Sequence, residues 1–294
     1  MSSSAAAAGS LQDPDEIAAQ AERLLADGDA YVFLRDQVVW QGSDDPAAML
    51  VGTEASMGAT AAGGFAYGPE SNLLEAVWTH NGLLALEGTQ APAYPMGYVT
   101  TFHSRPTMVE NGTVWWLAGL NASGGTTTQQ RVLYRSPSAS PADVQVELAT
   151  GDMLGGLVVS SPAGLDFDYH VSNDGSHLVM VVLMNTGSTA NDDHVYVDGA
   201  LFHQENTPNG TGDNWDNFDL VAINDLGMYA FTGDTSGGTG TDEFVALNGA
   251  IVVREGDVLD GVTLTTSASL RMISIDDAGR IVHAWGYAGN TIET

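Results

Sequence analysis

The segment EFVALNGAIVVREGD, residues 243–257, contains two short apolar runs separated by Asn248 and Gly249. Asn-Gly is a favoured pair for a two-residue type I′ hairpin turn, because both positions of that turn require a positive φ. The segment ends in an acidic residue followed by Gly256, which is typical of a further tight turn. It therefore predicts a pair of antiparallel strands that is bounded by turns.

Two turn signals related to this segment recur along the chain. The first, an acidic or polar residue before Gly or Asn after an apolar run, occurs in LLALEGTQAP at 83–92, VELATGD at 146–152, LFHQENT at 201–207 and VVREGD at 252–257. The second, an Asn- or Asp-rich turn that ends in Gly, occurs in VENG at 109–112, SNDG at 172–175, INDLG at 223–227 and IDDAG at 275–279. In each unit the second signal follows the first by 21 to 24 residues, so the chain is built from repeats.

Each second signal is followed by an alternating or apolar run that is typical of a strand. These runs are TVWWLAGL at 113–120, SHLVMVVLM at 176–184, MYAFTG at 228–233 and RIVHAWGY at 280–287. With the hairpin after it, one unit holds four antiparallel strands in roughly fifty residues, the size of a propeller blade. The sequence predicts an all-β protein, a five-bladed β-propeller.

The two ends of the chain are expected to share one blade. YVFLRDQVVWQGSDD, at 31–45, resembles the last hairpin of a unit, whereas the residues after Gly256 supply only the first two strands of one. Pairing the C-terminal strands with the N-terminal hairpin would complete the fifth blade and remove the open sheet edges. We therefore expect the propeller domain to span 29–294.

A short helix is expected over 13–28, ahead of the propeller. Asp13 suits the N-cap, Pro14 the first helical position, and Gly28 the position after the last turn. Its narrow apolar stripe indicates packing on the propeller. Residues 1–12 are expected to form a disordered tail.

The alternation of EGD-type turns with INDLG and IDDAG resembles a β-propeller repeat of uncharacterised secreted proteins from environmental bacteria. The resemblance covers the chain from about residue 30 and implies a propeller fold and an extracellular or cell-surface location. It brings no activity and no catalytic residues. YGPESN, at 67–72, stands where the first unit should have its Asn-Asp-x-Gly turn and departs from that form.

The chain is strongly acidic. It has 37 acidic residues against 8 basic ones, all of them Arg, and a formal net charge of −29. This field repels phosphate backbones and anionic lipids, so neither nucleic acid nor a membrane is an expected partner. The absence of cysteine excludes disulfides and thiolate chemistry. No apolar run is long enough to span a membrane, and MSSSAAAAGS at the start lacks the features of a signal peptide.

Candidate ligand-binding residues come from aligning the first strands of the units. The strands align on Phe65, Phe102, Phe167, Phe218 and Leu270, and polar residues follow or precede most of these positions. The predicted cluster near the axis consists of His103, Asp166, Asp168, Asp219 and Arg271, with Arg105 and His170 further along. Such residues can orient sugar hydroxyls or act as acid and base. The alternative is that they pair with one another for structural reasons.

Two further candidates lie around DNWDNFD, residues 213–219. Trp215 is expected in a polar loop at a channel mouth, where it could stack on a sugar. Asp213 and Asp216 could bind calcium, which takes oxygen ligands, although their spacing differs from that of an EF-hand. The alternative is that these acidic residues only form turns.

Three functions are compatible with these patterns. The first is a non-catalytic extracellular module that binds carbohydrate or another surface ligand, with calcium as a possible cofactor. The second is a glycoside hydrolase or lyase with acidic residues in the central channel, an analogy drawn from the fold. The third is a structural surface module. The repetition of one turn chemistry without a catalytic motif favours the first.

Overall fold

The computed structural model describes most of the chain from residue 31 onward. The described residues are 31–34, 37–41, 53–60, 64–70, 75–122, 128–160, 167–259, 261–264, 269–287 and 290–293. The predicted tail at 1–12 and helix at 13–28 lie outside these residues. The described part contains no helix that is long and apolar enough to cross a membrane.

Four sheets each contain four antiparallel strands that follow one another in sequence order. Sheet 1 consists of β3 (Thr53–Ala59), β4 (Phe65–Glu70), β5 (Ala76–Thr79) and β6 (Gly82–Leu86). Sheet 2 consists of β7 (Val99–Met108), β8 (Val114–Asn121), β9 (Gln130–Ser136) and β10 (Gln145–Ala149). Sheet 3 consists of β13 (Phe167–Val171), β14 (Leu178–Leu183), β15 (Asp193–Val197) and β16 (Ala200–Gln204). Sheet 4 consists of β17 (Trp215–Ile223), β18 (Tyr229–Thr235), β19 (Phe244–Leu247) and β20 (Ala250–Arg254).

Sheet 5 has three strands, and the remaining elements are small. Sheet 5 consists of β23 (Ser269–Ile275), β24 (Ile281–Tyr287) and β25 (Asn290–Glu293). Three separate hairpins are formed by β1 (Tyr31–Leu34) with β2 (Gln37–Gln41), β11 (Met153–Leu154) with β12 (Leu157–Val158), and β21 (Val258–Leu259) with β22 (Val262–Thr263). A single 3-10 turn, η2, spans Pro141–Asp143.

The predicted turn signals bound the strands as expected. Gly88, Gly151, Asn206 and Gly256 follow the fourth strands of sheets 1 to 4, and all four have positive φ. Gly112, Gly175, Gly227 and Gly279 end the turns between the first and second strands of sheets 2 to 5, again with positive φ. Asn248 and Gly249 likewise have φ values of 47° and 82°, as a type I′ turn requires. The repeat pattern therefore predicted the four-stranded units correctly.

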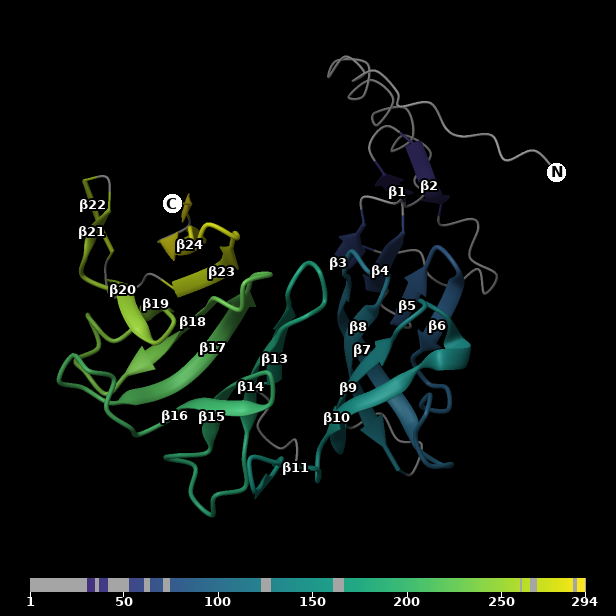
Figure 1. The fold of residues 1–294 in the computed structure, drawn as a ribbon, viewed down its shortest axis with the longest axis horizontal. Helices are drawn as coiled ribbons and strands as arrows, with labels where there is room; N and C mark the ends of the chain where they lie inside the picture. Colours follow the sequence, from purple (N-terminus) through teal and green to yellow (C-terminus); the bar gives the residue numbers. More distant parts are fainter. Residues whose placement is uncertain are drawn as a thin grey trace.

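The hydrophobic core lies between neighbouring sheets rather than inside any one of them. One buried cluster joins sheets 1 and 2, a second joins sheets 2 and 3, a third joins sheets 3 and 4, and a smaller one joins sheets 4 and 5. Figure 1 shows the five sheets following one another around an arc. Face-to-face packing of four-stranded meanders in this way is the arrangement of propeller blades.

The Asn- and Asp-rich turns also connect the sheets to one another. The side-chain amide of Asn111 donates to the carbonyl of Asp174, the backbone N–H of Asp174 donates to the carboxylate of Asp225, and the N–H of Asp225 donates to Asp277. Each turn from sheet 2 to sheet 5 is thus bonded to the next. The recurrence of these residues therefore has a structural reason beyond their tolerance of positive φ.

The predicted alignment of the first unit is wrong. Phe65 lies in β4, the second strand of sheet 1, and the first strand is β3. Between these strands the hydroxyl of Thr60 accepts the N–H of Gly64, and residues 61–63 lie outside the described residues. YGPESN does not form this turn, because residues 67–70 continue β4. Without an Asn-Asp-x-Gly sequence, this unit gave no signal that could fix its register.

The expected pairing of the two chain ends is not observed in the described residues. β1 and β2 pair only with each other. The third place in sheet 5 is taken by β25, which pairs with β24. Figure 1 shows β1 and β2 on the opposite side of the arc from β23 and β24. The shared blade predicted from the sequence is therefore absent from the described structure.

Candidate functional site

Asp168, one of the predicted ligand-binding residues, joins three first strands. Its carboxylate forms an ion pair with the Arg105 guanidinium on β7. It also accepts the backbone N–H of Val221 on β17, at 3.3 Å. Because Asp168 itself is buried on β13, its charge needs such partners. The Asp168 carboxylate therefore pairs with other groups for structural reasons, which was the alternative to ligand binding in the sequence analysis.

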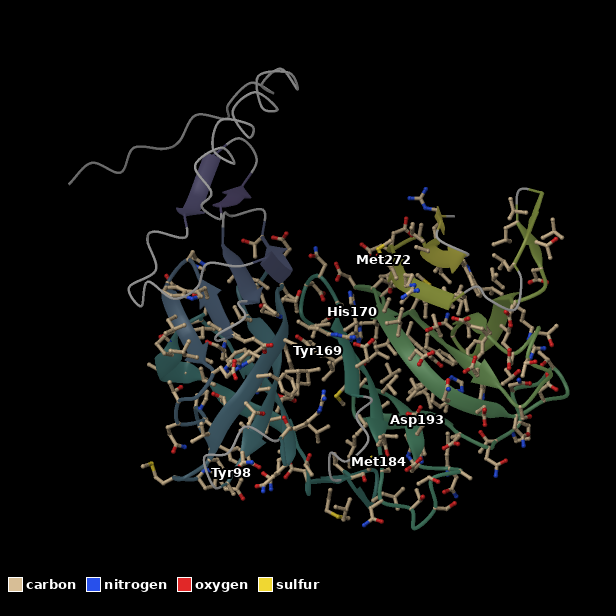
Figure 2. The ribbon with its side chains drawn as sticks, turned by 180° about the vertical axis from the view of Figure 1, so that it is seen from behind. Tyr98, Tyr169, His170, Met184, Asp193 and Met272 are labelled. Carbon is tan, nitrogen blue, oxygen red and sulfur yellow. The ribbon has the colours of Figure 1, made fainter. Side chains whose placement is uncertain are left out.

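Arg105 is held in an unusual backbone conformation. Its φ is +54°, within an irregular stretch of the β7–β8 pairing between Ser104 and Thr107. The hydroxyl of Tyr169 donates to the Arg105 carbonyl at 2.6 Å. Left-handed backbone costs about 1 kcal/mol or more for a residue other than glycine, and the ion pair with Asp168 together with the Tyr169 hydrogen bond stabilises it. Figure 2 shows Tyr169 and the neighbouring His170 near the middle of the molecule.

The two predicted histidines are buried or hydrogen-bonded within the fold. His103 is 3% exposed, and burial lowers its pKa to about 4. The Nδ1 atom of His170 accepts the N–H of Ile223 at 3.2 Å, and burial lowers its pKa. Both imidazoles are therefore neutral at pH 7 and serve the packing of the first strands.

The residues of the predicted cluster differ in their exposure. Asp219 on β17 and Arg271 on β23 are exposed, and Asp166 lies outside the described residues. His103 and Asp168 are buried, so these two side chains offer little surface to a ligand. The shared strand position was predicted correctly for sheets 2 to 5, but side-chain direction varies with the irregular register of β7, β17 and β23.

Trp215 does not lie in a loop at a channel mouth. It is the first residue of β17 and only 2% exposed. Its ring packs against Phe231 and Phe244, with centroids 5.3 and 4.9 Å away. The sequence prediction failed because the neighbouring Asp216 and Asn217 are exposed while the indole is buried, at a point where the pairing of β17 with β18 is irregular.

The two proposed calcium ligands, Asp213 and Asp216, lie in different surroundings. The carboxylate of Asp213 forms an ion pair with Arg254, at 2.9 Å, and Asp216 is exposed on β17. Across the described residues, no group of three or more Asp, Glu, His or Cys side chains has a geometry that could hold a metal ion.

A set of carboxylates that sequence reasoning missed connects neighbouring sheets. Glu75 accepts the N–H of His103 at 2.7 Å, linking sheet 1 to sheet 2. Asp193 accepts the N–H of Phe218 at 2.7 Å, linking sheet 3 to sheet 4. Glu243 accepts the N–H of Leu270 at 2.5 Å, linking sheet 4 to sheet 5.

The three linking residues occupy one position, at the start of the third strand. In each case the N–H of the acidic residue that ends the fourth strand donates to the carbonyl of the linking residue: Glu87 to Glu75, Glu205 to Asp193, and Glu255 to Glu243. In sheet 2 the N–H of Thr150 donates to Arg131 in the same way. Arg131 therefore stands where the other sheets have a carboxylate. Aligning the third strands EAVW, RVLY, DHVY and EFVA would have revealed the position.

An open groove lies where sheets 2 and 3 meet, and its volume is about 320 Å³. Its floor is apolar and includes Trp115, Leu148, Val171 and Met180, all of which are buried. The groove lies within the size range of small-molecule sites, which begins at about 300 Å³.

An ion pair and a hydrogen-bonded histidine–carboxylate pair line the same groove. On sheet 2, the Arg135 guanidinium contacts Glu147 with Nε and Oε2 3.0 Å apart, and it lies 5.9 Å from the centroid of the Trp115 ring. On sheet 3, Nδ1 of His177 contacts the Asp198 carboxylate at 2.8 Å. The side chains of both pairs are partly exposed. The groove thus combines an apolar floor with hydrogen-bonding groups on both walls.

Neither a family model nor a curated protein matches the chain. Among solved structures, the chain is similar to a protein of unknown function from Bacteroides caccae, with 13% identity, 88% of this chain and 82% of that chain covered, and a TM-score of 0.42. It is also similar to a gluconolactonase from Xanthomonas campestris, with 13% identity, coverage of 84% and 71%, and a TM-score of 0.39. The Dos1 propeller shows 9% identity, coverage of 80% and 53%, and a TM-score of 0.38. The fold assignment depends on the sheets of this protein, because all three TM-scores are low.

Proposed function

We propose that the protein is a non-catalytic binding module for a carbohydrate, which occupies the groove between sheets 2 and 3. The observation that supports this is the combination, in one groove, of an apolar floor with the partly exposed Arg135–Glu147 ion pair and the partly exposed His177–Asp198 hydrogen bond. A pyranose ring has an apolar face of C–H groups and an edge of hydroxyls. The floor suits the face, and the charged side chains suit the edge.

The polar groups of the groove can both donate and accept hydrogen bonds. Arg135 retains guanidinium donors beyond those that contact Glu147, and a carboxylate such as Asp198 can accept several hydrogen bonds. Bidentate recognition of neighbouring hydroxyls requires paired groups of this kind held in place. The Arg135–Glu147 and His177–Asp198 contacts hold these groups in place, which lowers the conformational entropy lost on binding. A neutral sugar also avoids the repulsion that an anionic ligand would meet from a net charge of −29.

The distribution of perturbed carboxyl groups favours binding over hydrolysis. A glycosidase needs a carboxylic acid whose pKa is raised, close to a second carboxylate. The carboxyl groups whose pKa rises to about 7 are Glu243 and Glu255. Both belong to sheet 4 and neither lines the groove. The hydrolase or lyase therefore stays the weaker proposal.

Glycan-array binding followed by titration calorimetry tests the proposal. Arg135→Ala and His177→Ala should each weaken binding of the selected glycan at least tenfold, because each removes a donor from one wall. The matched control is Arg280→Ala, which breaks an exposed ion pair with Asp276 on sheet 5. It should leave binding unchanged.

The outcomes separate the three functions. Binding that survives both groove substitutions contradicts the groove as the site. If the protein cleaves a polysaccharide and Glu243→Gln or Glu255→Gln abolishes that turnover, the hypothesis of an enzyme replaces the hypothesis of a binding module. If a broad glycan set gives neither binding nor turnover, a structural surface module replaces both. The same proposal includes a location outside the cell. Its only support is the resemblance of the recurring turns to the repeat of secreted bacterial proteins.

We also propose that the ring closes as a five-bladed propeller. Sheet 5 has one strand fewer than the other sheets, and the β1–β2 hairpin has two unpaired edges in the described structure. Met272 and Val282 on sheet 5 are 45% and 48% exposed. Figure 2 shows Met272 on the side of sheet 5 that faces the first sheets across the arc.

Spin labels test closure directly, because the chain has no cysteine of its own. Labels at Gln37→Cys and Val282→Cys should lie within about 20 Å if the two strands share a sheet, since neighbouring strands are roughly 5 Å apart. A much longer distance, measured by pulsed electron resonance, contradicts the shared blade.

A further inference from the structure

The sheet 3 wall of the groove is built around the Asp198 carboxylate. Asp198 and Gly199 form the turn between β15 and β16, with φ values of 50° and 78°, as in a type I′ turn. Oδ1 of Asp198 accepts the backbone N–H of Leu178 at 2.9 Å, and Oδ2 accepts a hydrogen bond from Nδ1 of His177 at 2.8 Å. Two fixed partners therefore orient a carboxylate whose side chain is still 46% exposed.

Two further carboxylates lie beside the same end of the groove. Oδ1 of Asp174 accepts both the N–H and the hydroxyl of the groove-lining Ser176, at 2.8 and 2.6 Å. The carboxylate of Asp225, in the corresponding turn of sheet 4, accepts the N–H of Asp174 at 2.8 Å. The sheet 4 turn also reaches the imidazole, because a Cβ atom added to Gly227 would lie 3.3 Å from Cε1 of His177. The His177 end of the groove is therefore bordered by three acidic turns.

The ionisable side chains that line the groove carry no excess of positive charge. Arg135 is the one arginine among them, and its guanidinium contacts Glu147 with Nε and Oε2 3.0 Å apart. Asp198 adds a second carboxylate, so the lining has one negative charge in excess when His177 is neutral and is balanced when His177 is protonated. The Glu147 charge is offset by Arg135, whereas Asp198 has the Leu178 N–H and the His177 ring as its hydrogen-bond partners.

The floor of the groove also holds a donor without an acceptor. Trp115 lines the groove and is only 6% exposed. Its indole N–H has no hydrogen-bond partner in the described part of the chain. A buried donor without an acceptor is costly. The groove therefore favours a ligand that carries acceptor oxygens as well as a positive charge.

We propose that the sugar bound in this groove is an amino sugar, whose ammonium group lies at the His177–Asp198 end. The inference rests on the carbohydrate-binding function proposed above and names the class of sugar. An ammonium group has N–H donors and a positive charge, so it can form a charge-assisted hydrogen bond to the remaining lone pairs of the Asp198 carboxylate. The carboxylates of Asp174 and Asp225 add attraction at longer range.

Two related classes of sugar fit this end of the groove less well. An N-acetylated amino sugar has lost the positive charge and keeps a single amide donor at that position. A uronic acid would bring its own carboxylate toward Asp198, where like charges repel. Selection is therefore expected at the amine itself rather than at the ring hydroxyls.

Titration calorimetry on the full chain with three β-1,4-linked tetrasaccharides tests the proposal. The tetramers of glucosamine, N-acetylglucosamine and glucose share one backbone and carry an amine, an acetamide or a hydroxyl at C2. At pH 6 and low salt, the glucosamine tetramer should bind roughly tenfold more tightly than the other two, because only its C2 groups become cationic. The difference should shrink as the ionic strength rises, since salt screens partly exposed charges.

Asp198→Asn assigns the preference to the groove. Asparagine is favoured before glycine in a type I′ turn, and its side-chain oxygen can still accept the N–H of Leu178, so the turn is retained. The variant should reduce the preference for the glucosamine tetramer over the glucose tetramer to about threefold or less. The matched control, Asp216→Asn, removes the same charge from an exposed position on β17 that does not line the groove. It should keep the full preference.

The outcomes separate this inference from the proposed function. Equal binding of the three tetramers, weakened in each case by Arg135→Ala, overturns the amino sugar and leaves the carbohydrate-binding module in place. A preference that keeps its full size in Asp198→Asn also overturns the amino-sugar assignment, because the attraction then comes from the net charge of the chain. If none of the tetramers binds, the amino-sugar assignment is overturned, and the glycan array decides the wider proposal. If Asp198→Asn fails to fold, the wild-type preference and its salt dependence decide.

Discussion

Neighbouring sheets are linked differently at two joints of the molecule. A carboxylate that accepts a backbone N–H links sheets 4 and 5, whereas an arginine–aspartate ion pair links sheets 2 and 3. Sheets 4 and 5 are linked by Glu243, which accepts the N–H of Leu270 and has other carboxyl groups as its charged neighbours. Sheet 2 has Arg131 at the equivalent position, and its link to sheet 3 is the Arg105–Asp168 ion pair. The comparison teaches that the same backbone hydrogen bond recurs in both sheets, whereas the side chains decide whether a carboxylate–amide contact or an ion pair links the joint.

The two joints also differ in whether polar side chains are available to bind a ligand. The groove lies at the joint of sheets 2 and 3, with the Arg135–Glu147 ion pair and the His177–Asp198 hydrogen bond along it. At the joint of sheets 4 and 5, the acidic side chains are used for the link itself. A joint whose charges are already compensated by cations can present hydrogen-bonding groups to a ligand without electrostatic strain.

The largest effect is expected from Asp168→Ala, which removes the compensating charge from the joint of sheets 2 and 3. The N–H of Val221 loses its acceptor and the strained Arg105 loses its ionic partner. Urea unfolding should show a loss of about 3 kcal/mol in the free energy of unfolding. The control Asp216→Ala, at an exposed position on β17, should change that free energy by less than about 0.5 kcal/mol. Equal effects in the two variants would remove the distinction between a linking carboxylate and a surface one.

A smaller effect is expected from Asp193→Ala, at the joint of sheets 3 and 4. This change leaves the buried N–H of Phe218 without its acceptor, which costs about 2 kcal/mol. Asp193→Asn keeps an acceptor oxygen and should lose less than half of that. If the two variants unfold at the same urea concentration, the hydrogen bond to Phe218 does not carry the link.

The smallest effect is expected from Arg131→Gln, at the position where sheet 2 departs from its neighbours. The Arg131 guanidinium lies 4.8 Å from the centroid of the Phe102 ring, a contact that contributes about 0.5 to 1 kcal/mol near a protein surface. A melting curve should shift by a few degrees at most. A loss as large as that of Asp168→Ala would show that Arg131, rather than Arg105, holds the joint.

Much of the fold was predictable because turns with positive φ leave a strong mark on sequence. Gly112, Gly175, Gly227 and Gly279 fixed the phase of sheets 2 to 5. Sheet 1 was misaligned at Phe65, since the sequence between β3 and β4, TAAGG at 60–64, has no Asn or Asp. The candidate site was less predictable. Trp215 and Asp168 were selected by residue type, yet burial and pairing depend on which way each side chain faces across an irregular strand.

By itself, the sequence determined most of the local units of this protein: where the chain turns in sheets 2 to 5, which runs form strands, and that sheets 2 to 4 hold four of them. Those features depend on residues close together along the chain, whose backbone preferences act locally. Only the tertiary structure decided that Glu75, Asp193 and Glu243 link neighbouring sheets, and that Trp115 and His177 line one groove. These contacts join residues of different sheets, and no local preference specifies which faces meet.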